Sequence, residues 1–384
     1  MSKPNIRFRG YTEDWEQRKL GYVVEVCSGR DYKHLEEGNI PVYGTGGYML
    51  SVSDALSYNE DAIGIGRKGT IDKPYILKAP FWTVDTLFYC VPKAKYDLNF
   101  AFDLFQNINW KAMDESTGVP SLSKTIINKV EVLSPTLPEQ QKIGNYLNKL
   151  DHLITLHQRK CEETRKLKKY MLQKMFPQNG KKFPEIRFKG FTEDWEQRKL
   201  GEIADLTSSK RVHAQDYVDS GIPFYRGKEI SELREHKPVS EVLYITEEKY
   251  KEMAKLYGSP QVGDLLITAV GTIGNTWVVD NVPFYFKDGN LIWFKNIKCN
   301  PNYLDYVLSS DDGQKKIDVS AIGSNQKALT MVKLNELKFM FPNDDEQVKI
   351  GEYFSCLDHL ITLHQQKYEE LQKIKKFMLQ NMFV

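Results

Sequence analysis

The stretch IRFRGYTEDWEQRKLG, from Ile6 to Gly21, decides the architecture of this chain because it occurs twice. It returns as IRFKGFTEDWEQRKLG from Ile186 to Gly201. The two copies differ only at the pairs Arg9/Lys189 and Tyr11/Phe191. A repeat of this fidelity indicates that the chain contains two structural units of the same kind, and it constrains the interpretation of every other pattern.

A second repeated stretch follows in each half. Glu139–Gln158 (EQQKIGNYLNKLDHLITLHQ) returns as Glu346–Gln365 (EQVKIGEYFSCLDHLITLHQ). The blocks between the repeats have diverged, but both consist of short apolar stretches interrupted by Gly and Pro, which predicts strands joined by turns. Ile222–Tyr225 still echoes Ile40–Tyr43, so we expect one fold that carries two sets of side chains. The repeated motifs are nearly identical, which indicates that one partner binds the same surface twice. The blocks between them have diverged, which indicates that they bind two different targets.

Two long helices are predicted, over residues 138–176 and 344–384. Pro138 suits the first position of a helix, and Asn343 or Asp344 can cap the second helix. Apolar residues recur at alternating steps of three and four, which is the spacing of a coiled-coil seam. The seam residues are Ile143, Leu147, Leu150, Ile154, His157, Cys161, Met171 and Met175, and then Ile350, Phe354, Leu357, Ile361, His364, Tyr368, Leu371, Met378 and Met382. At 1.5 Å per residue, each helix is a rod of roughly 55 Å.

The order of these parts predicts an α+β protein with a pseudo-two-fold internal repeat. Residues 1–137 would hold the motif and a first strand-rich domain, 138–176 the first long helix, 177–343 a linker, the repeated motif and a second strand-rich domain, and 344–384 the second long helix. Two rods in one chain pack most economically against each other, here in antiparallel fashion. The alternative is that each rod docks separately on its own domain.

Composition excludes several classes of protein. A chain of 384 residues with 41% apolar and 27% charged residues is typical of globular domains, and it has no apolar run long enough to span a bilayer. The start MSKPNIRFRG lacks a secretory signal, and the five cysteines form no CxxC pair, which fits a cytoplasmic location and argues against a structural zinc site. The net charge of +2 means that nucleic acid would have to be held by local patches or with a partner's help.

Motifs that resemble catalytic or metal sites have simpler explanations. Gly64–Gly69 matches GxGxxG, but a strand-like stretch broken by Pro74 follows it, which favours a β-turn over a nucleotide-binding helix start. Pro41–Gly47 resembles the methyl-donor loop of adenine methyltransferases, yet its counterpart Pro223–Gly227 lacks those glycines. The pairs His152/His157 and His359/His364 have a spacing of five, which is unfavourable for one metal on a helix. We therefore expect no catalytic and no metal site in this chain.

The repeated motif RFRGYTEDWEQRKLG, together with the helices that carry Glu-Gln-x-x-Ile-Gly-x-Tyr and Leu-Asp-x-Leu-Ile, resembles the DNA specificity subunit of Type I restriction–modification systems. The resemblance covers nearly the whole chain. It implies two target recognition domains separated by antiparallel coiled-coil helices, each domain reading one part of a split, asymmetric double-stranded DNA sequence. Such subunits are not catalytic. They recruit two methylation subunits, which transfer a methyl group from S-adenosylmethionine to adenine N6, and restriction subunits that use ATP and Mg; we expect no cofactor on this chain itself.

Polar side chains on loops are the candidates for base contacts, because Arg suits guanine and Asn or Gln suits adenine. In the first domain these are Arg67, Lys68, Thr70, Ser121, Ser123 and Lys124, with Tyr43 and Thr45 as further choices. In the second domain they are Arg226, Lys228, Thr272, Asn275, Thr276, Ser324, Asn325, Gln326 and Lys327. The alternative for each is a solvated loop residue that contacts nothing.

The repeated motif also offers candidates for a partner interface. Trp15 with Arg18, and Trp195 with Arg198, either anchor the methylation subunit or pack inside the motif. Two other functions stay open at this point. A stand-alone methyltransferase with divergent motifs would bind S-adenosylmethionine, and a coiled-coil scaffold would bind no DNA; a scaffold has little reason to diversify only its globular parts.

Overall fold

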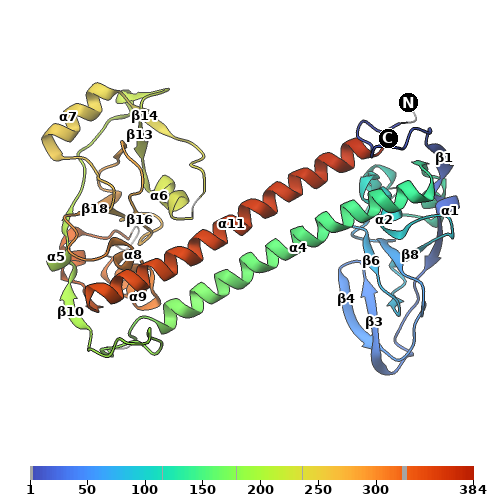
Figure 1. Ribbon diagram of the computed structural model, residues 1–384, viewed down its shortest axis with the longest axis horizontal. Helices are drawn as coiled ribbons and strands as arrows, with labels where there is room; N and C mark the ends of the chain where they lie inside the picture. Colours follow the sequence, from blue (N-terminus) through green and yellow to red (C-terminus); the bar gives the residue numbers. More distant parts are fainter. Residues whose placement is uncertain (1–2, 115, 179, 236, 322–326) are drawn as a thin grey trace. The chain divides into compact units, whose positions relative to one another are not determined.

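The computed structural model describes residues 3–384 apart from 115, 179, 236 and 322–326. It divides into two compact units, one of Met1–Gln158 with Gln366–Val384 and the other of Arg159–Gln365. Two long helices, α4 (Leu137–Lys174) and α11 (Asp344–Met382), each have residues in both units (Figure 1).

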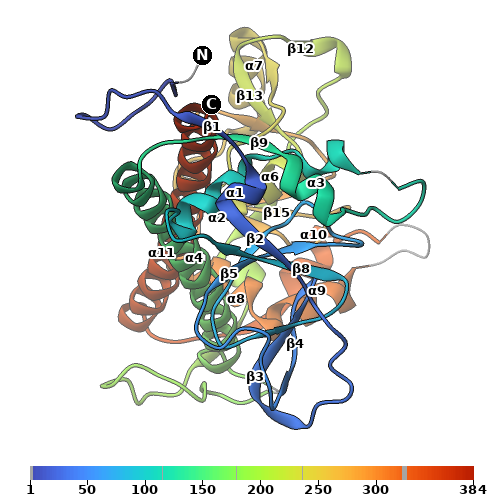
Figure 2. The same cartoon turned by 90° about the vertical axis from the view of Figure 1, so that its right-hand side faces the viewer.

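The first strand-rich domain is built on a four-stranded antiparallel sheet with the order β2-β8-β5-β6. Beside it, β3 pairs antiparallel with β4 and parallel with β7, and the β3–β4 hairpin projects from the four-stranded sheet (Figure 2). Strand β1, from the repeated motif, pairs with β9 and so ties the beginning of the domain to its end. The strands are β1 (Glu16–Lys19), β2 (Val24–Ser28), β3 (Glu37–Gly44), β4 (Gly47–Val52), β5 (Ala62–Gly66), β6 (Tyr75–Leu77), β7 (Trp82–Thr83), β8 (Leu87–Pro92) and β9 (Glu131–Ser134). The helices are α1 (Leu20–Val23), α2 (Leu98–Asn107), the 3-10 helix η1 (Trp110–Met113) and α3 (Lys124–Lys129).

The second strand-rich domain repeats this topology. Its four-stranded sheet has the order β11-β18-β15-β16, β10 pairs with β19, and β13 pairs antiparallel with β14 and parallel with β17. The strands are β10 (Glu196–Lys199), β11 (Asp205–Thr207), β12 (Tyr217–Val218), β13 (Ile222–Tyr225), β14 (Leu243–Ile245), β15 (Leu265–Thr268), β16 (Thr276–Val278), β17 (Tyr285–Phe286), β18 (Leu291–Lys295) and β19 (Lys338–Phe341). The helices are α5 (Leu200–Ile203), η2 (Ala214–Asp216), α6 (Gly227–Arg234), α7 (Glu247–Tyr257), α8 (Pro301–Ser309), α9 (Asp311–Ser320) and α10 (Met331–Glu336). The prediction of one fold with two sets of side chains is confirmed, and α6 and α7 are additions of the second domain.

The long helices pack against each other in antiparallel fashion. In the first unit, Lys375 of α11 donates to Asp151 of α4 over 2.5 Å. In the second unit, Lys168 of α4 donates to both oxygens of Asp358 over 2.5 and 2.7 Å, and the Cys161 thiol lies 3.7 Å from the Ile361 carbonyl oxygen. Higher numbers on α4 therefore meet lower numbers on α11. The predicted antiparallel pair is confirmed.

The C-terminal end of each long helix enters the core where the other long helix begins. In the first unit Phe383 stacks on Phe100 of α2, with ring centroids 5.5 Å apart, and Ile6 N–H donates to the Asn381 carbonyl. In the second unit Phe176, just after α4, lies at 5.8 Å from Phe354 of α11. The first domain therefore buries a segment from the far end of the chain, whereas the second buries the residues that directly precede its own copy of the motif.

Each copy of the motif holds the start of a long helix through a buried arginine–glutamate pair, which we call the Arg–Glu clamp. Arg7 donates to Glu139 over 2.7 and 2.8 Å, and Arg187 donates to Glu346 over 2.7 Å at both nitrogens. Both glutamates are buried. The hydrogen bonds to these carboxylates raise the pKa of each arginine. The clamp explains why the motif and the helix start recur together.

Removal of the charge at one clamp should destabilise the fold strongly. In Glu139→Gln the partly buried Arg7 loses its buried counter-ion, so we expect the free energy of unfolding to fall by about 3 kcal/mol. Urea denaturation of the full chain measures this. The matched control is Glu16→Gln, which breaks the exposed Arg18–Glu16 pair and should change stability little. Equal losses in the two variants would contradict the structural role of the clamp.

Asp103 of α2 is a buried acid without a matching base. Its side chain is 2% exposed, and Oδ2 has no hydrogen-bond partner among the described residues. Burial raises its pKa well above the ordinary value, Asp151 and Asp97 raise it further, and Lys375 lowers it. Counted from the helix cap, the same place in α8 holds Tyr306, whose hydroxyl donates to Asp358 over 2.8 Å. The first unit thus lacks a hydrogen bond that the second unit makes.

This acid should make stability depend on pH. Because the folded chain raises the pKa of Asp103, the contribution of Asp103 to stability is full below the ordinary Asp pKa of about 4 and is lost as pH rises towards the raised value. We expect Asp103→Asn to be more stable relative to the unchanged protein at pH 7.5 than at pH 4.5. Urea denaturation at both pH values measures the difference, with the exposed Asp219→Asn as control. A difference that does not vary with pH would refute the prediction.

Candidate nucleic-acid interface

The glycine motif after β5 is a tight turn. Gly69 has φ +88°, and a Cβ atom on Gly66 would lie 2.1 Å from the Thr70 carbonyl oxygen, so both positions require glycine. Bends follow β5 there and no helix begins, which agrees with the expectation that GxGxxG is not the start of a nucleotide-binding helix. The counterpart in the second domain, Gly271 with φ +82°, has the same left-handed conformation.

The turn brings two predicted clusters of the first domain together. Lys68 forms an antiparallel bridge with Ser121, and Gly69 N–H donates to the Pro120 carbonyl over 2.9 Å. Leu122 N–H donates to the Arg67 carbonyl over 3.0 Å. Arg67, Lys68, Ser121 and the start of α3 therefore share one surface, which we call the first recognition face.

The side chains of the first recognition face differ in their freedom to bind a ligand. Arg67 and Lys68 are exposed; the Arg67 guanidinium lies 5.8 Å from the Phe88 ring centroid and donates to the Asp85 carbonyl over 3.4 Å. The Ser123 hydroxyl caps α3 by accepting from Ile126 N–H, while Lys124 is exposed. Ser121 and Thr70 are half-buried. Arg67, Lys68 and Lys124 are the cations best placed to meet an anionic partner.

The β3–β4 hairpin adjoins this face through the 84–86 segment. Val84 N–H donates to the Tyr43 carbonyl over 3.0 Å, and Arg67 N–H donates to the Thr86 carbonyl over 2.8 Å. Tyr43 is half-buried, its ring centroid 6.4 Å from that of Tyr48, and Thr45 lies in the turn of the hairpin. Tyr48 and Met49 are exposed at the tip of the hairpin. The sequence analysis missed them, although Tyr-Met directly after a run of turn glycines is an unusual place for large apolar side chains.

The second domain gathers its candidates in the same way. Val270 forms a bridge with Ala328, and Leu329 N–H donates to the Ala269 carbonyl over 2.8 Å, so the glycine turn again lies beside the segment before α10. Helix α6 adds Ser231, whose hydroxyl lies 3.2 Å from that of Thr272 and accepts from Asn275 Nδ2 over 2.9 Å. We call this surface the second recognition face. Its candidate residues among those described are Arg226, Lys228, Thr272, Asn275 and Lys327.

The prediction for Thr276 is wrong. Its side chain is 1% exposed, and its hydroxyl donates to Asp305 and lies 3.3 Å from the Ser309 hydroxyl, so it cannot reach a base. It begins β16, in which Thr276 and Trp277 are both buried. Lys327 is exposed and pairs with Asp318 over 2.9 Å. Ser324, Asn325 and Gln326 lie outside the described residues.

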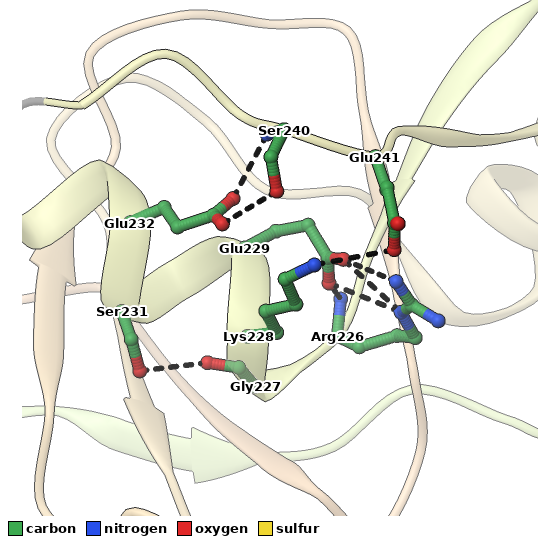
Figure 3. A network of polar contacts seen from close by, with 8 residues as sticks. All are labelled: Arg226, Gly227, Lys228, Glu229, Ser231, Glu232, Ser240 and Glu241. Carbon is green, nitrogen blue, oxygen red and sulfur yellow. Dashed lines mark hydrogen bonds and ion pairs between the residues drawn. The ribbon is translucent and has the colours of Figure 1, made fainter. Parts of the chain in front are cut away.

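Arg226 is held by a network at the start of α6 (Figure 3). Its guanidinium donates to Glu229, with distances from 2.5 to 3.2 Å, and its backbone N–H donates to the same carboxylate over 2.6 Å. Lys228 pairs with Glu241 over 3.2 Å, and Glu232 accepts from the backbone and hydroxyl of Ser240. These bonds to the carboxylate raise the pKa of Arg226, so the side chain stays charged. The network fixes the loop before β14 against α6.

The structure separates the partner-interface candidates into two kinds. Trp15 and Trp195 are each 3% exposed and pack on the aromatic rings of their own units, so internal packing accounts for both. Arg18 is exposed beside Glu16, and Arg198 is half-exposed. The two arginines remain interface predictions.

Arg18 lines a pocket of about 940 Å³ in the first unit. Lys19, Lys93, Lys95 and the exposed Tyr22 contribute to the same wall. The pocket is thus lined mainly by basic and tyrosine side chains, with one acidic residue, Glu131. The sequence feature that belongs to this site is Lys-Ala-Lys at 93–95. Its position beside the repeated motif could not be predicted, because it depends on how β8 packs in the fold.

Neither a metal centre nor a membrane span emerges from the described residues. Among them, no group of three His, Cys, Asp or Glu side chains could hold an ion, and His152 and His359 are half- or fully exposed on the long helices. Their helices, like the others that the structure describes, are not long and apolar enough to cross a bilayer.

Comparisons with known proteins agree with this architecture. Residues 12–165 and 192–373 match the family model described as Type I restriction modification DNA specificity domain. The MjaX specificity subunit of Methanocaldococcus jannaschii, a putative Type I restriction enzyme subunit, is 27% identical over 392 residues, which cover 98% of this chain and 82% of that protein. The MjaVIII specificity subunit of the same organism is 26% identical over 280 residues, 69% of this chain. The match spans 64% of the MjaVIII protein's own length.

A solved structure shares the fold over the full length. The crystal structure of a Type I restriction–modification S subunit from M. genitalium superposes with a TM-score of 0.72 over 100% of this chain and 99% of that chain. The sequence identity is 15%, so this likeness establishes the fold and nothing finer.

Proposed function

Because the chain belongs to the family of Type I restriction–modification DNA specificity domains, we propose that its two strand-rich domains read the two parts of a bipartite, asymmetric DNA sequence. The observation that supports this proposal is one topology with two recognition faces of different chemistry. In the first face, Arg67 and Lys68 lie on the glycine turn and no helix lies beside it. In the second face, the additional helix α6 brings its N-cap residue Arg226 and its residue Ser231 beside the turn. Two domains with the same topology but different recognition faces suit a DNA target whose two parts differ in sequence.

The chain is a specificity subunit and not an enzyme. We propose that methylation of adenine N6 is carried out by two partner subunits that bind S-adenosylmethionine, and that restriction subunits bring ATP and Mg. The repeated motif supports two equivalent docking places, since β1 and β10 present the same residues in both halves. Adenine has to leave the base stack for methylation, so a partner that encloses the DNA would supply phosphate contacts that this weakly charged chain lacks.

We further propose that α4 and α11 together set the gap between the two half-sites. Each is continuous, and each is held to the other by half-buried lysine–aspartate pairs, Lys375–Asp151 and Lys168–Asp358. A paired helix resists bending better than a linker, and readers on a rigid element keep a constant phase on the DNA helix. The rival interpretation as a stand-alone methyltransferase has less support, because Pro41–Gly47, which resembles a methyl-donor loop, forms part of the β3–β4 hairpin.

Methylation mapping tests the bipartite target. We expect a host that carries this chain and its methylation partner to acquire N6-methyladenine at an asymmetric motif made of two short parts with a constant gap. Single-molecule sequencing of the host genome measures the motif. A continuous or palindromic motif would contradict the proposal. Calorimetric titration of the isolated chain with S-adenosylmethionine is the control, and binding there would revive the methyltransferase alternative.

The length of the helices should determine the gap. Deletion of one heptad from the middle of each of α4 and α11 shortens both by roughly 10 Å, at 1.5 Å per residue, which corresponds to about three base pairs. We expect the two parts of the methylated motif to stay the same while the gap between them shortens. A matched deletion in only one helix should abolish assembly. An unaltered gap in an active double deletion would refute the role of the helices.

The first recognition face should contribute base contacts. We expect Arg67→Gln to weaken cognate DNA binding by the assembled complex by about 1–3 kcal/mol and to relax preference at one base pair, because a lost bidentate contact has this effect. Lys68→Gln should reduce the salt dependence of binding by about one counter-ion. Band-shift titration at several salt concentrations measures both. Lys149→Gln, an exposed lysine of α4, is the control, and unchanged discrimination in Arg67→Gln would count against this face.

A further inference from the structure

The junction between β13 and α6 presents an arginine whose orientation is already determined by the protein. Arg226 Nε donates to the two Glu229 oxygens over 3.1 and 3.2 Å, and its Nη2 donates to Oε1 over 2.5 Å (Figure 3). Glu229 is 0% exposed, and its Oε2 also accepts from the Arg226 backbone N–H. The carboxylate therefore cannot rotate away without breaking the start of α6. The guanidinium plane is held from one side.

The opposite edge of this guanidinium stays available. A guanidinium has five N–H donors in a planar fork, and Glu229 takes the Nε donor and one of the Nη2 donors. Nη1 has no partner among the described residues and is not one of the buried atoms that lack one, so it reaches the surface. The Arg226 side chain is 32% exposed. One N–H of Nη1 and the second N–H of Nη2 are thus parallel and lie on the edge that Glu229 does not use.

The neighbouring candidates are engaged in other contacts. Lys228 pairs with Glu241, and Lys327 pairs with Asp318. The Thr272 hydroxyl lies against that of Ser231, which also donates to the Gly227 carbonyl over 2.9 Å. Arg226 is therefore the described residue of the second recognition face that combines a fixed orientation with two free parallel donors.

Two parallel donors match one base edge. Guanine presents N7 and O6 side by side as acceptors in the major groove, whereas adenine presents an acceptor and a donor there. Resting on the proposed function, we propose that Arg226 reads a guanine of the second half-site through its Nη1 and Nη2 donors, and that Glu229 is the positioning residue that aims it. A side chain held in its bound orientation loses less rotamer freedom on binding.

Among the described residues of the first domain, no arginine takes the equivalent place. The residue after Tyr43 is Gly44, whereas the residue after the corresponding Tyr225 is Arg226. A Cβ atom on Gly44 would lie 2.8 Å from the sulfur of Met49, an exposed and flexible side chain that can move aside, so the difference between the domains is the missing side chain and not a lack of space. The Arg226–Glu229 pair is therefore a feature of the second domain, and the two domains should differ in the bases that they read.

The test uses the complex of this chain with its methylation partner and duplexes of the mapped target sequence. Each guanine of the second half-site is replaced in turn by 7-deazaguanine, which lacks the N7 acceptor. We expect one replacement to weaken binding by the unchanged complex roughly tenfold or more. In Arg226→Lys, which keeps the charge but not the fork, cognate binding should fall by a similar factor and that replacement should have no further effect. Glu229→Gln should lose part of the discrimination, and Lys251→Gln on α7 should retain all of it.

The outcomes separate this proposal from the proposed function. A second half-site without guanine, or an Arg226→Lys complex that discriminates 7-deazaguanine as the unchanged complex does, would overturn the role of Arg226. A Glu229→Gln complex that folds, by circular dichroism, and discriminates fully would overturn the positioning role. If the unchanged complex shows no preference among DNA sequences, the proposed function itself fails.

Discussion

The fold depends on two buried salt bridges, Arg7–Glu139 and Arg187–Glu346, because each attaches a copy of the repeated motif to the first turn of a long helix. A buried carboxylate at a helix N-terminus is favoured by the helix dipole, and a bidentate arginine neutralises it with fixed geometry. The geometry fixes where each helix starts relative to its domain. The position of the later turns of each helix follows from where the helix starts. A small shift at the clamp would therefore move the side chains through which α4 and α11 pack.

The long-range architecture could be predicted from sequence because it follows from periodicity and repetition. The spacing of Ile143, Leu147 and Leu150 defines a buried stripe whatever the neighbours are, and all three are buried. The turn at Gly69 was predictable because positive φ restricts the residue type. Individual contact residues were not, since exposure depends on tertiary neighbours. Thr276 lies only four residues after Thr272, yet its hydroxyl is bonded to Asp305 of α8, and the sequence around Thr276 does not show that this helix packs against it.

The two units differ in the hydrogen bonding of two buried polar side chains. Trp195 donates its indole N–H to Glu346 over 3.2 Å, whereas the indole nitrogen of Trp15 is buried without a partner among the described residues. Likewise, Asp103 stands where the second unit has Tyr306. At these two places the first unit leaves a buried polar atom without a hydrogen bond, whereas the second unit makes one. Both cases concern side chains around the core, where one copy of a duplicated unit can change while the shared backbone plan persists.

The burial of Phe383 against Phe100 sets an order of events during synthesis. The first domain leaves the ribosome long before the residues that complete its core, because the whole second domain is translated in between. Until α11 arrives, Trp15 and Phe100 lack one of their aromatic neighbours. The domain that is made first is therefore completed last, and a nascent chain stalled in the second domain would expose an unfinished apolar cavity to chaperones or to aggregation.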